Sequence, residues 1–373
     1  MIFMKRLKKI LTILEGIYNY NLSRHFRSLK PTELQINVTY LCNSRCQMCQ
    51  IWKLKPKCEL TAGEWQRIME DPIFLGIRRL SICGGEPTLH PNLITLVKLF
   101  LKSMPNLESL SLVTNGLLSS QIVSTVKSMA TLLKKRKIDF SVSVSLDGIG
   151  NIHNLIRGVP DAFEKTSKTI KTLKGLQSKY DFSLGAAGVI LRENLQLIRD
   201  VENWCSKLEI PFNYQIVGFH ETYVQNIERK KELDFGDKNK EDLYSLLKEL
   251  SLRCSLRNPR AVLRSYYWND MLHLYKGGLR TTPCPFVLDA FVLDSLGDVY
   301  YCLSEKKIGN CREGKSIGEI YYNPRNLALR RQRAKTICLK CNSACFISSA
   351  IVKDFKKFFW FYLTGKRGTV GVY

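Results

Sequence analysis

The sequence predicts an α/β fold, an incomplete barrel of six strand–helix units followed by a small cysteine-rich domain. Strand-like runs of alternating or β-branched residues recur near residues 33–39, 77–83, 108–114, 138–147, 182–191 and 209–217. Helical stretches such as 91–103 and 161–178 lie between them and are long enough for right-handed crossovers between parallel strands. Six units are too few for a closed barrel of eight, so we expect a partial (β/α)6, TIM-like barrel.

Three cysteines, Cys42, Cys46 and Cys49, directly follow the first expected strand in a C-x3-C-x2-C run. Three thiolates can hold three corners of a [4Fe–4S] cluster and leave one iron open. A zinc site is the alternative, although the nearest further cysteine, Cys58, lies beyond a lysine-rich stretch. Active residues of such barrels lie at the C-terminal ends of the strands, so we expect the chemistry at this run.

Later strand ends carry further polar or glycine-rich segments. Each is weak alone, because an ordinary turn or a solvated arginine explains it equally well. Their order along successive strands is what carries weight. They are Gly84-Gly85-Glu86-Pro87, Thr114-Asn115-Gly116, Ser145-Leu146-Asp147-Gly148 and, further on, Arg157.

In this order the motifs resemble the radical S-adenosylmethionine (radical SAM) superfamily. The resemblance implies that the three cysteines hold a [4Fe–4S] cluster and that Glu86 in the Gly-Gly-Glu-Pro loop binds the amino group of SAM. It also implies SAM reduction to a 5′-deoxyadenosyl radical, which abstracts hydrogen from a small molecule, lipid, sugar or peptide. The cofactor-binding residues implied in this way are Gly84, Gly85, Glu86, Pro87, Asn115, Ser145, Asp147 and Arg157.

A second cysteine pattern lies near the C-terminus. Gly297 follows Cys284 after twelve residues, Cys302 comes four residues later, and the pattern ends in Cys338-x2-Cys341-x3-Cys345. It resembles the SPASM and shortened twitch modules of radical SAM enzymes. That resemblance implies one auxiliary [4Fe–4S] cluster on Cys284, Cys302, Cys338 and Cys341, with Cys345 either a spare or the true fourth ligand. A zinc ribbon stays open as the alternative, and Cys311 close by is a candidate hydrogen-atom donor.

These segments divide the chain into five expected parts. They are a basic amphipathic helix over 1–31, the barrel over 32–220, a helical bridge over 221–280, the auxiliary domain over 281–346, and a basic aromatic tail over 347–373.

The net charge of +24 and a pI near 9.5 predict attraction to anionic partners. Two readings of the basic, apolar termini are open: contact with an anionic membrane surface, or packing on the barrel as ordinary amphipathic helices. Neither terminus reaches the roughly 20 apolar residues of a membrane span. The arginine cluster from Arg325 to Lys335 has no accompanying nucleic-acid fold signature, so nucleic acid is not expected as a partner, although an RNA substrate is kept as an alternative.

Thirteen cysteines without a cleavable signal sequence predict a reducing, cytoplasmic location, with peripheral membrane contact open. The resemblance implies an electron donor of the flavodoxin or ferredoxin type. A non-catalytic iron–sulfur electron-transfer or scaffold protein is the other hypothesis, but such a protein would have no use for Glu86, Ser145 and Arg157.

Overall fold

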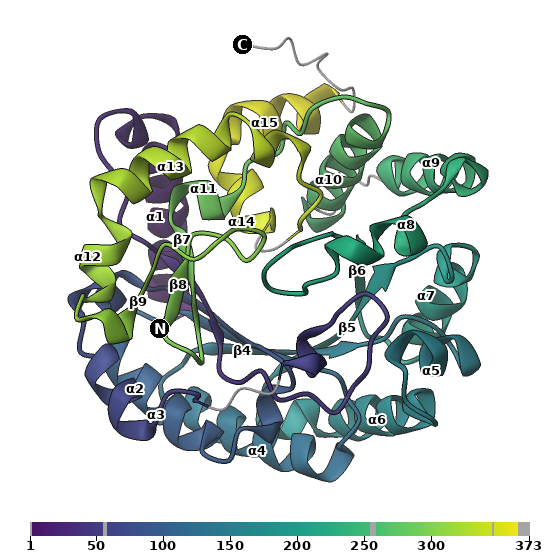
Figure 1. Ribbon diagram of the computed structural model, residues 1–373, viewed down its shortest axis with the longest axis horizontal. Helices are drawn as coiled ribbons and strands as arrows, with labels where there is room; N and C mark the ends of the chain where they lie inside the picture. The colour runs from purple at the N-terminus through teal and green to yellow at the C-terminus, as the bar shows by residue number, and fades with distance from the viewer. Residues whose placement is uncertain (1, 55–57, 254–258, 345–346, 365–373) are drawn as a thin grey trace. The chain divides into compact units, whose positions relative to one another are not determined.

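The computed structural model describes residues 2–54, 58–253, 259–344 and 347–364. The chain divides into two compact units, coloured along the chain in Figure 1. The sheet unit comprises residues 31–235 and 290–326, and the helical unit comprises residues 1–30, 236–289 and 327–373.

The sheet unit is built on nine strands in the order β6-β5-β4-β3-β2-β1-β7-β8-β9. Strands β1 to β6 pair in parallel with their neighbours, β7 adds to the other side of β1 in parallel, and β8 and β9 continue antiparallel. As described, the sheet is open, with β6 and β9 at its edges. The strands are β1 Glu33–Asn37, β2 Arg79–Cys83, β3 Ser109–Thr114, β4 Asp139–Ser145, β5 Ser183–Ile190, β6 Phe212–Ile216, β7 Ala290–Asp294, β8 Asp298–Tyr300 and β9 Gly309–Asn310.

The predicted fold class and the six expected strands are confirmed. Strand β7 is a further parallel strand that the sequence analysis did not predict. Because β7 pairs with β1 along its whole length, residues 290–326 belong to the sheet unit. Residues 281–346, expected as one auxiliary domain, are therefore divided between the two units.

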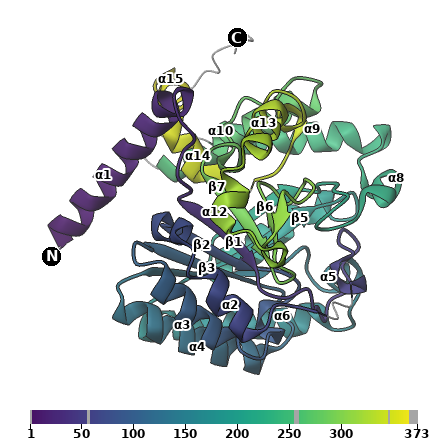
Figure 2. The ribbon, with the colours of Figure 1, turned by 60° about the vertical axis from the view of Figure 1, so that its left-hand side comes forward.

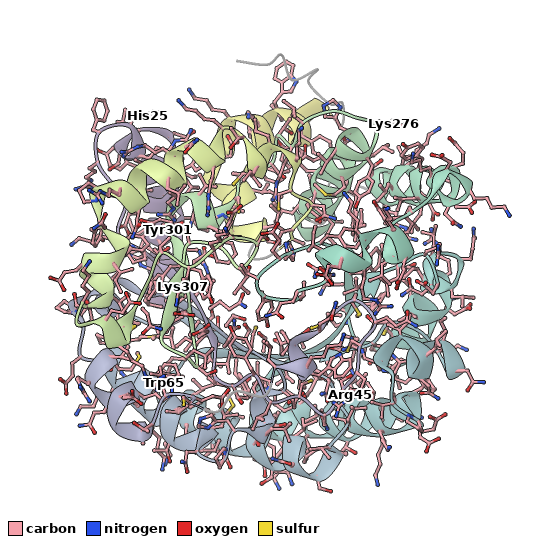
Figure 3. All side chains as sticks on the ribbon, viewed as in Figure 1. His25, Arg45, Trp65, Lys276, Tyr301 and Lys307 are labelled. Carbon is pink, nitrogen blue, oxygen red and sulfur yellow. The ribbon has the colours of Figure 1, made fainter. Side chains whose placement is uncertain are left out.

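Helices of the sheet unit cover one face of the parallel strands (Figure 1). Leu80, Leu110 and Val142 point to this face and are at most 1 % exposed. Trp65 of α2, labelled in Figure 3, meets Phe100 of α3 edge to face with ring centroids 5.6 Å apart. The α-helices of the sheet unit, including α8 and α12 outside this layer, are α2 Ala62–Ile68, α3 Leu93–Ser103, α4 Ser119–Lys135, α5 Asn151–Arg157, α6 Ala162–Tyr180, α7 Ile198–Lys207, α8 Lys230–Leu233 and α12 Ile317–Tyr321.

The other face of the same strands carries small polar side chains. Ser81, Ser111 and Ser141 are paired in register across β2, β3 and β4, and Ser143 and Ser145 follow on β4. Residues on this face of β3 to β5 are half-buried, in alternation with the buried apolar ones. Branched apolar residues fill the interior of a closed barrel, whereas this face of the open sheet is lined by small, half-buried side chains.

The helical unit packs around α14. Helix α14 contacts α1, α10 and α15, and Lys353 at its end forms a buried ion pair of 2.7 Å with Asp289. No described helix combines the length and hydropathy that crossing a bilayer requires. The helices are α1 Ile2–Asn21, α9 Asp237–Leu252, α10 Pro259–Tyr275, α11 Pro285–Leu288, α13 Pro324–Ala334 (mostly in this unit), α14 Ile347–Lys353 and α15 Phe355–Thr364.

Candidate active site

The cysteine loop begins where the chain leaves β1, and main-chain contacts hold it in place. The Arg45 N–H donates to the Arg157 carbonyl at 2.8 Å, which ties the loop to the end of α5. The Arg45 guanidinium, labelled in Figure 3, lies 5.1 Å from the centre of the Trp52 ring. Asn226 donates through Nδ2 to the Met48 carbonyl at 2.8 Å. The loop is therefore anchored at both ends before any metal binds.

The three predicted cluster ligands lie on one loop, close enough for their charges to act on one another. Burial raises the pKa of Cys42 to about 11 and that of Cys49 to about 12. The charge of Cys46 raises both pKa values further, and that of Cys42 also raises the pKa of Cys49. These groups are therefore thiols in the metal-free chain. Metal binding requires thiolates, so loading a cluster here releases protons.

Several polar hydrogens surround the sulfur atoms. Ser44 Oγ lies 3.1 Å from Cys46 Sγ, and Arg157 Nη1 donates to the same sulfur at 3.5 Å. The main-chain N–H of Ser44 donates to Cys42 Sγ at 3.4 Å. Hydrogen bonds to the sulfurs and a nearby cation favour the thiolate form and tune the potential of an iron–sulfur cluster. Within the described residues, no three His, Cys, Asp or Glu side chains form a group that could hold a single metal ion.

The predicted Gly-Gly loop lies beside the segment that leads into Cys42. Gly85 N–H donates to the Thr39 carbonyl and Glu86 N–H to the Leu41 carbonyl, both at 2.8 Å. A Cβ on Gly84 would lie 2.3 Å from Thr39 O, and one on Gly85 would lie 2.2 Å from Leu41 O. Gly84 also has a φ of +135°. Glycine is required at both positions because any side chain would force the two segments apart.

The Glu86 carboxylate is fully buried and accepts hydrogen bonds from the protein itself. Its donors are Thr88 N at 3.2 Å, Thr88 Oγ1 at 2.7 Å, Thr114 Oγ1 at 2.9 Å and Asn115 N at 2.7 Å. Burial raises the pKa of Glu86, and these hydrogen bonds oppose that shift. Glu86 thus joins the Gly-Gly loop to the end of β3, while Pro87 begins the 3-10 turn Pro87–Leu89. The contact of Glu86 with the SAM amino group stays a prediction.

Asp147 and Arg157 form a buried ion pair with Nε and Oδ2 2.6 Å apart. Burial alone would lower the pKa of Arg157, but Asp147 and Cys46 raise it overall, so the arginine stays charged. The other Asp147 oxygen accepts Val189 N–H at 2.8 Å. Ser145, the last residue of β4, lies half-buried on the polar face of the sheet. The predicted contacts of these residues with SAM stay predictions.

Two side chains that the sequence analysis missed, Asn43 and His153, complete this group. Asn115 Nδ2 donates to Asn43 Oδ1 at 2.7 Å, which joins β3 to the cysteine loop. His153 accepts Asp147 N–H on Nδ1 at 3.1 Å, which places its proton on Nε2. Burial, followed by the charge of Arg157, lowers the pKa of His153 to about 4. The sequence did contain a signal for His153: it lies four residues before Arg157, and residues four apart on a helix lie on the same side.

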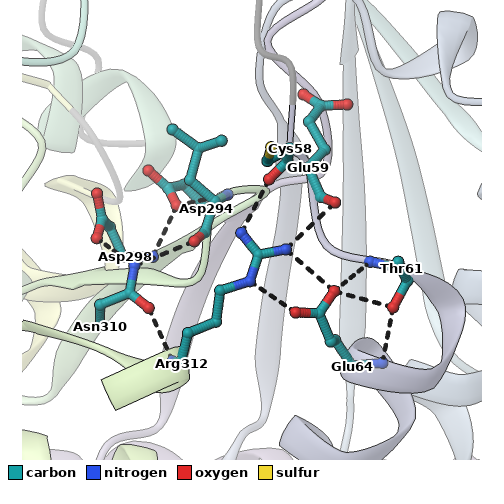
Figure 4. A network of polar contacts seen from close by, with 9 residues as sticks. Cys58, Glu59, Thr61, Glu64, Asp294, Asp298, Asn310 and Arg312 are labelled. Carbon is teal, nitrogen blue, oxygen red and sulfur yellow. Dashed lines mark hydrogen bonds and ion pairs between the residues drawn. The ribbon is translucent and has the colours of Figure 1, made fainter.

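A polar network joins the chain just after the cysteine loop to the hairpin that follows β7 (Figure 4). Glu59 accepts Tyr40 N–H at 2.6 Å and Ser295 Oγ–H at 2.9 Å. Arg312 donates to Glu64 at 2.6 and 3.0 Å and to the Cys58 carbonyl at 2.9 Å. The Arg312 hydrogen bonds lower the pKa of Glu64 to about 2. These contacts fix the β7–β9 segment to residues 58–64, which follow the cysteine loop.

The predicted auxiliary ligands are divided between the two units. In the helical unit Arg280 donates to the Cys341 carbonyl at 3.1 Å and, through its main-chain N–H, to the Leu339 carbonyl at 2.7 Å. Burial lowers the pKa of Arg280, but the charges of Cys284 and Cys341 raise it overall, so both thiols lie near this cation.

Other members of the predicted auxiliary set are placed less directly. Cys338 lies in the 3-10 turn Ile337–Lys340 of the helical unit, while Cys302 belongs to the sheet unit. Cys345 lies outside the described residues. Cys311 is half-buried after β9, where burial and the charge of Asp294 raise its pKa to about 12. The ligand set and the hydrogen-donor role of Cys311 stay predictions.

The fold is an open parallel β/α barrel. Thiols, a Gly-Gly loop and a buried arginine–aspartate pair lie at the C-terminal ends of its strands. These features are typical of a barrel protein that depends on a bound cofactor. Residues 36–205 match the Radical SAM superfamily. The matched segment, somewhat under half of the chain, carries the motifs of a radical SAM domain, as the sequence analysis predicted. SAM and a [4Fe–4S] cluster are the cofactors of this domain, and the grouped cysteines with their sulfur-directed donors fit such a cluster.

Curated relatives match part of the chain. A probable GTP 3′,8-cyclase of Thermococcus kodakarensis is 30 % identical over 161 residues, covering 39 % of this chain and 49 % of the relative. A probable GTP 3′,8-cyclase of Methanopyrus kandleri is 30 % identical over 179 residues, covering 42 % of this chain and 53 % of the relative. The chain thus spans about half the length of these relatives.

Solved structures match most of the chain and support its fold. The crystal structure of Streptococcus suis SuiB bound to S-adenosylmethionine aligns with a TM-score of 0.56 and 17 % identity, covering 92 % of this chain and 78 % of SuiB. Native anSMEcpe with bound AdoMet aligns with a TM-score of 0.55 and 20 % identity, covering 89 % and 97 % of the two chains.

Proposed function

We propose that this protein is a radical SAM enzyme that reductively cleaves SAM and abstracts a hydrogen atom from its substrate. The observation that carries the proposal is the grouping of Cys42, Cys46 and Cys49 beside the Gly-Gly loop at the C-terminal strand ends. When bound, SAM and the reduced cluster supply a 5′-deoxyadenosyl radical. The protein supplies binding, orientation and exclusion of water.

The residues of this chain have separable parts in that task. Gly84 and Gly85 let the loop approach the segment before Cys42, and Glu86 fixes the loop against β3. Asp147 holds the Arg157 cation beside Cys46, where it favours the charged thiolate. We propose that Asn115, Ser145 and Arg157 contact SAM, since all three lie at or beyond the same strand ends.

Two further parts of the proposal concern electrons. An auxiliary [4Fe–4S] cluster on the C-terminal cysteines would accept an electron from the substrate radical or help to bind the substrate. A flavodoxin- or ferredoxin-type donor would reduce the first cluster, and the net charge of +24 would attract an acidic donor. Iron analysis tests the auxiliary site: about eight irons per chain are expected for two clusters, and about four would leave the C-terminal cysteines without one.

The polar face of the sheet favours a neutral, hydroxyl-bearing substrate. Ser111 and Ser141 offer half-buried hydroxyl groups in register with the buried Ser81, and Arg79, the sole lysine or arginine of strands β1 to β6, is ion-paired with Glu33 at 3.0 Å. A triphosphate would need several cations for its charge. We therefore expect GTP neither to increase 5′-deoxyadenosine formation nor to yield a new product, and a GTP-dependent product would overturn this substrate class.

Anaerobic reconstitution tests the enzyme proposal itself. With SAM and dithionite, the loaded protein is expected to release 5′-deoxyadenosine, and Cys46→Ala is expected to abolish this release. Cys205→Ala, which removes a buried thiol in α7, is the matched control and should retain it. A fully loaded protein that never cleaves SAM would refute the proposal and favour the electron-transfer or scaffold alternative. Cleavage stimulated by RNA would favour the RNA-modifying alternative.

We also propose that the protein works in the cytoplasm, peripherally at an anionic membrane. The net charge of +24 supports this location, because anionic lipid attracts basic segments. Sedimentation of the full chain with anionic vesicles tests it, and a protein that stays in the supernatant at low salt would exclude it.

A further inference from the structure

We propose that α1 and α15 of the helical unit together form a lipid-binding surface that inserts apolar side chains into an anionic membrane. The inference rests on the proposed peripheral location and names the surface that makes the contact. This interfacial surface consists of Leu7, Ile10, Leu11, Leu14 and Tyr18 on α1, and Lys356, Phe359, Trp360 and Leu363 on α15.

Helix α1 exposes an apolar stripe. Leu7, Leu11, Leu14 and Tyr18 follow one another at spacings of four, three and four residues, and Ile10 lies three residues after Leu7 and four before Leu14, which places all five on one side of the helix. All are exposed, with Leu11 at 57 % and Leu14 at 54 %. A stripe of this length and regularity differs from the singly scattered apolar residues of an ordinary surface.

The opposite side of α1 is the one that packs within the unit. A Cβ on Gly16, on the side opposite the leucines, would lie 3.3 Å from Lys353 Cγ of α14, and Asn21 in the last turn of α1 donates to the Lys353 carbonyl at 2.9 Å. Tyr20 donates its hydroxyl hydrogen to Asp354 at 3.3 Å. The helix thus turns a glycine and polar contacts toward its own unit and its leucines outward, the reverse of an ordinary surface helix. Among the described residues of the helical unit, α1 therefore does not pack through its leucines.

Helix α15 repeats the arrangement. Phe361 is buried and meets Tyr266 of α10 with ring centroids 5.1 Å apart. Phe359, Trp360 and Leu363 lie on the other side and are exposed, Trp360 at 58 %. Tryptophan has an apolar ring and a polar N–H, so it is suited to the boundary between lipid tails and head groups.

Both helices belong to one packed unit. Helix α14 contacts α1 and α15, and all three are visible together in Figure 2. The hydroxyl of Tyr20 near the end of α1 contacts Asp354, the residue before α15. The two apolar faces are therefore carried by neighbouring helices.

The charges of these helices favour anionic lipid over a second copy of the chain. The sequence of α1 has four basic residues at positions 5, 6, 8 and 9 and a single acidic one, Glu15. Lys356 and Lys357 are exposed on α15. Two such surfaces would repel each other, whereas basic residues next to an apolar face bind anionic head groups.

Sedimentation of the full chain with vesicles tests the surface. We expect binding to phosphatidylcholine vesicles that contain about 30 % phosphatidylglycerol, weaker binding to pure phosphatidylcholine, and loss of binding as salt rises from about 0.1 M to about 0.5 M. The double variant Leu11→Glu with Leu14→Glu should weaken binding about tenfold or more, and Trp360→Ala by a smaller factor. Leu75→Glu, which changes an equally exposed leucine of the sheet unit, should bind as the unchanged protein does.

The outcomes separate the two proposals. If the unchanged protein does not sediment with anionic vesicles, both the proposed membrane location and the proposed lipid-binding surface are wrong. If it binds and the α1 and α15 variants bind equally well, the location stands and the surface is overturned. Light scattering tests whether a second copy of the chain binds the stripe instead. If the unchanged protein is a dimer and the double variant Leu11→Glu with Leu14→Glu is a monomer, the stripe is a self-association surface and the lipid-binding proposal is overturned. Unchanged 5′-deoxyadenosine formation by these variants in solution shows that they fold.

Discussion

Replacing Arg157 by methionine is expected to destabilise the sheet unit strongly, because the change leaves Asp147 buried without its cation. The two groups lie 2.6 Å apart, and the Asp147 side chain has no solvent exposure. Methionine preserves most of the aliphatic volume of arginine, so the lost interaction is the charge and its hydrogen bonds. The remaining partner of the carboxylate is Val189 N–H at 2.8 Å.

The magnitude follows from the burial of the pair. Removing one partner of a buried ion pair costs about 3–5 kcal/mol, because the other charge is left uncompensated in a poorly solvated site. A loss of about 4 kcal/mol lowers the folding equilibrium constant about a thousandfold. Adding Asp147→Asn to Arg157→Met removes the stranded charge and keeps an acceptor for Val189 N–H. We expect this double variant to regain about 2 kcal/mol of the loss.

Urea unfolding followed by circular dichroism, at matched cluster loading, measures these differences. Arg192→Met is the control, since Arg192 pairs with Glu193 on the surface at 3.4 Å and should change stability by about 0–1 kcal/mol. If Arg157→Met unfolds like the unchanged protein, or if Asp147→Asn does not rescue it, the reasoning about the buried pair is wrong. Restored stability without restored SAM cleavage would place Arg157 at the cofactor as well as in the fold.

Gly85→Ala tests the Gly-Gly loop, with Gly175→Ala as its control, and His153→Asn tests the histidine of α5 beside this ion pair. Gly85→Ala should abolish SAM cleavage and destabilise the unit by about 2 kcal/mol or more, because its Cβ would lie 2.2 Å from Leu41 O. Gly175→Ala in α6, where no atom lies within 4 Å of the added Cβ, should instead stabilise by about 0.5–1 kcal/mol in the same unfolding assay. A tolerated Gly85→Ala would contradict the close approach of the two segments. His153, with its pKa lowered from 6.5 to about 4, stays neutral in the fold while the unfolded chain takes up a proton below pH 6.5, so stability should fall as the pH is lowered. At pH 5 this loss should reach about 2 kcal/mol, and His153→Asn should lack it. An equal loss in that variant would assign the acid sensitivity to other groups.

The parallel strands could be predicted because each is marked by its own residues. A strand covered on one face alternates apolar and small polar side chains, as in residues 138–147, where β4 spans Asp139–Ser145. The strand ends carried the cysteine run and the Gly-Gly loop, so the position of the candidate site followed from the order of elements. Such patterns can be recognised in the sequence because they involve residues that are close together in the chain and do not depend on long-range contacts.

Strand β7 could not be predicted in the same way. Its residues Ala290–Asp294 form a short apolar run between Cys284 and Cys302. No local pattern in this run indicates that it pairs with β1. The pairing of Glu33 with Ala290 joins segments far apart in the chain and depends on the whole sheet. The network of Glu59 and Arg312 was missed for the same reason, since its partners come from both ends of the sheet unit.

The environment of Glu86 shows how the structure changes the meaning of a predicted residue. A carboxylate has about four lone-pair sites, and four donors from Thr88, Thr114 and Asn115 already occupy them. The ammonium group of SAM would therefore have to displace one of these donors to bind the side chain. Because the carboxylate is fully buried, that exchange would also disturb the end of β3. The geometry thus makes Glu86 first a positioning residue that holds the Gly-Gly loop against the end of β3.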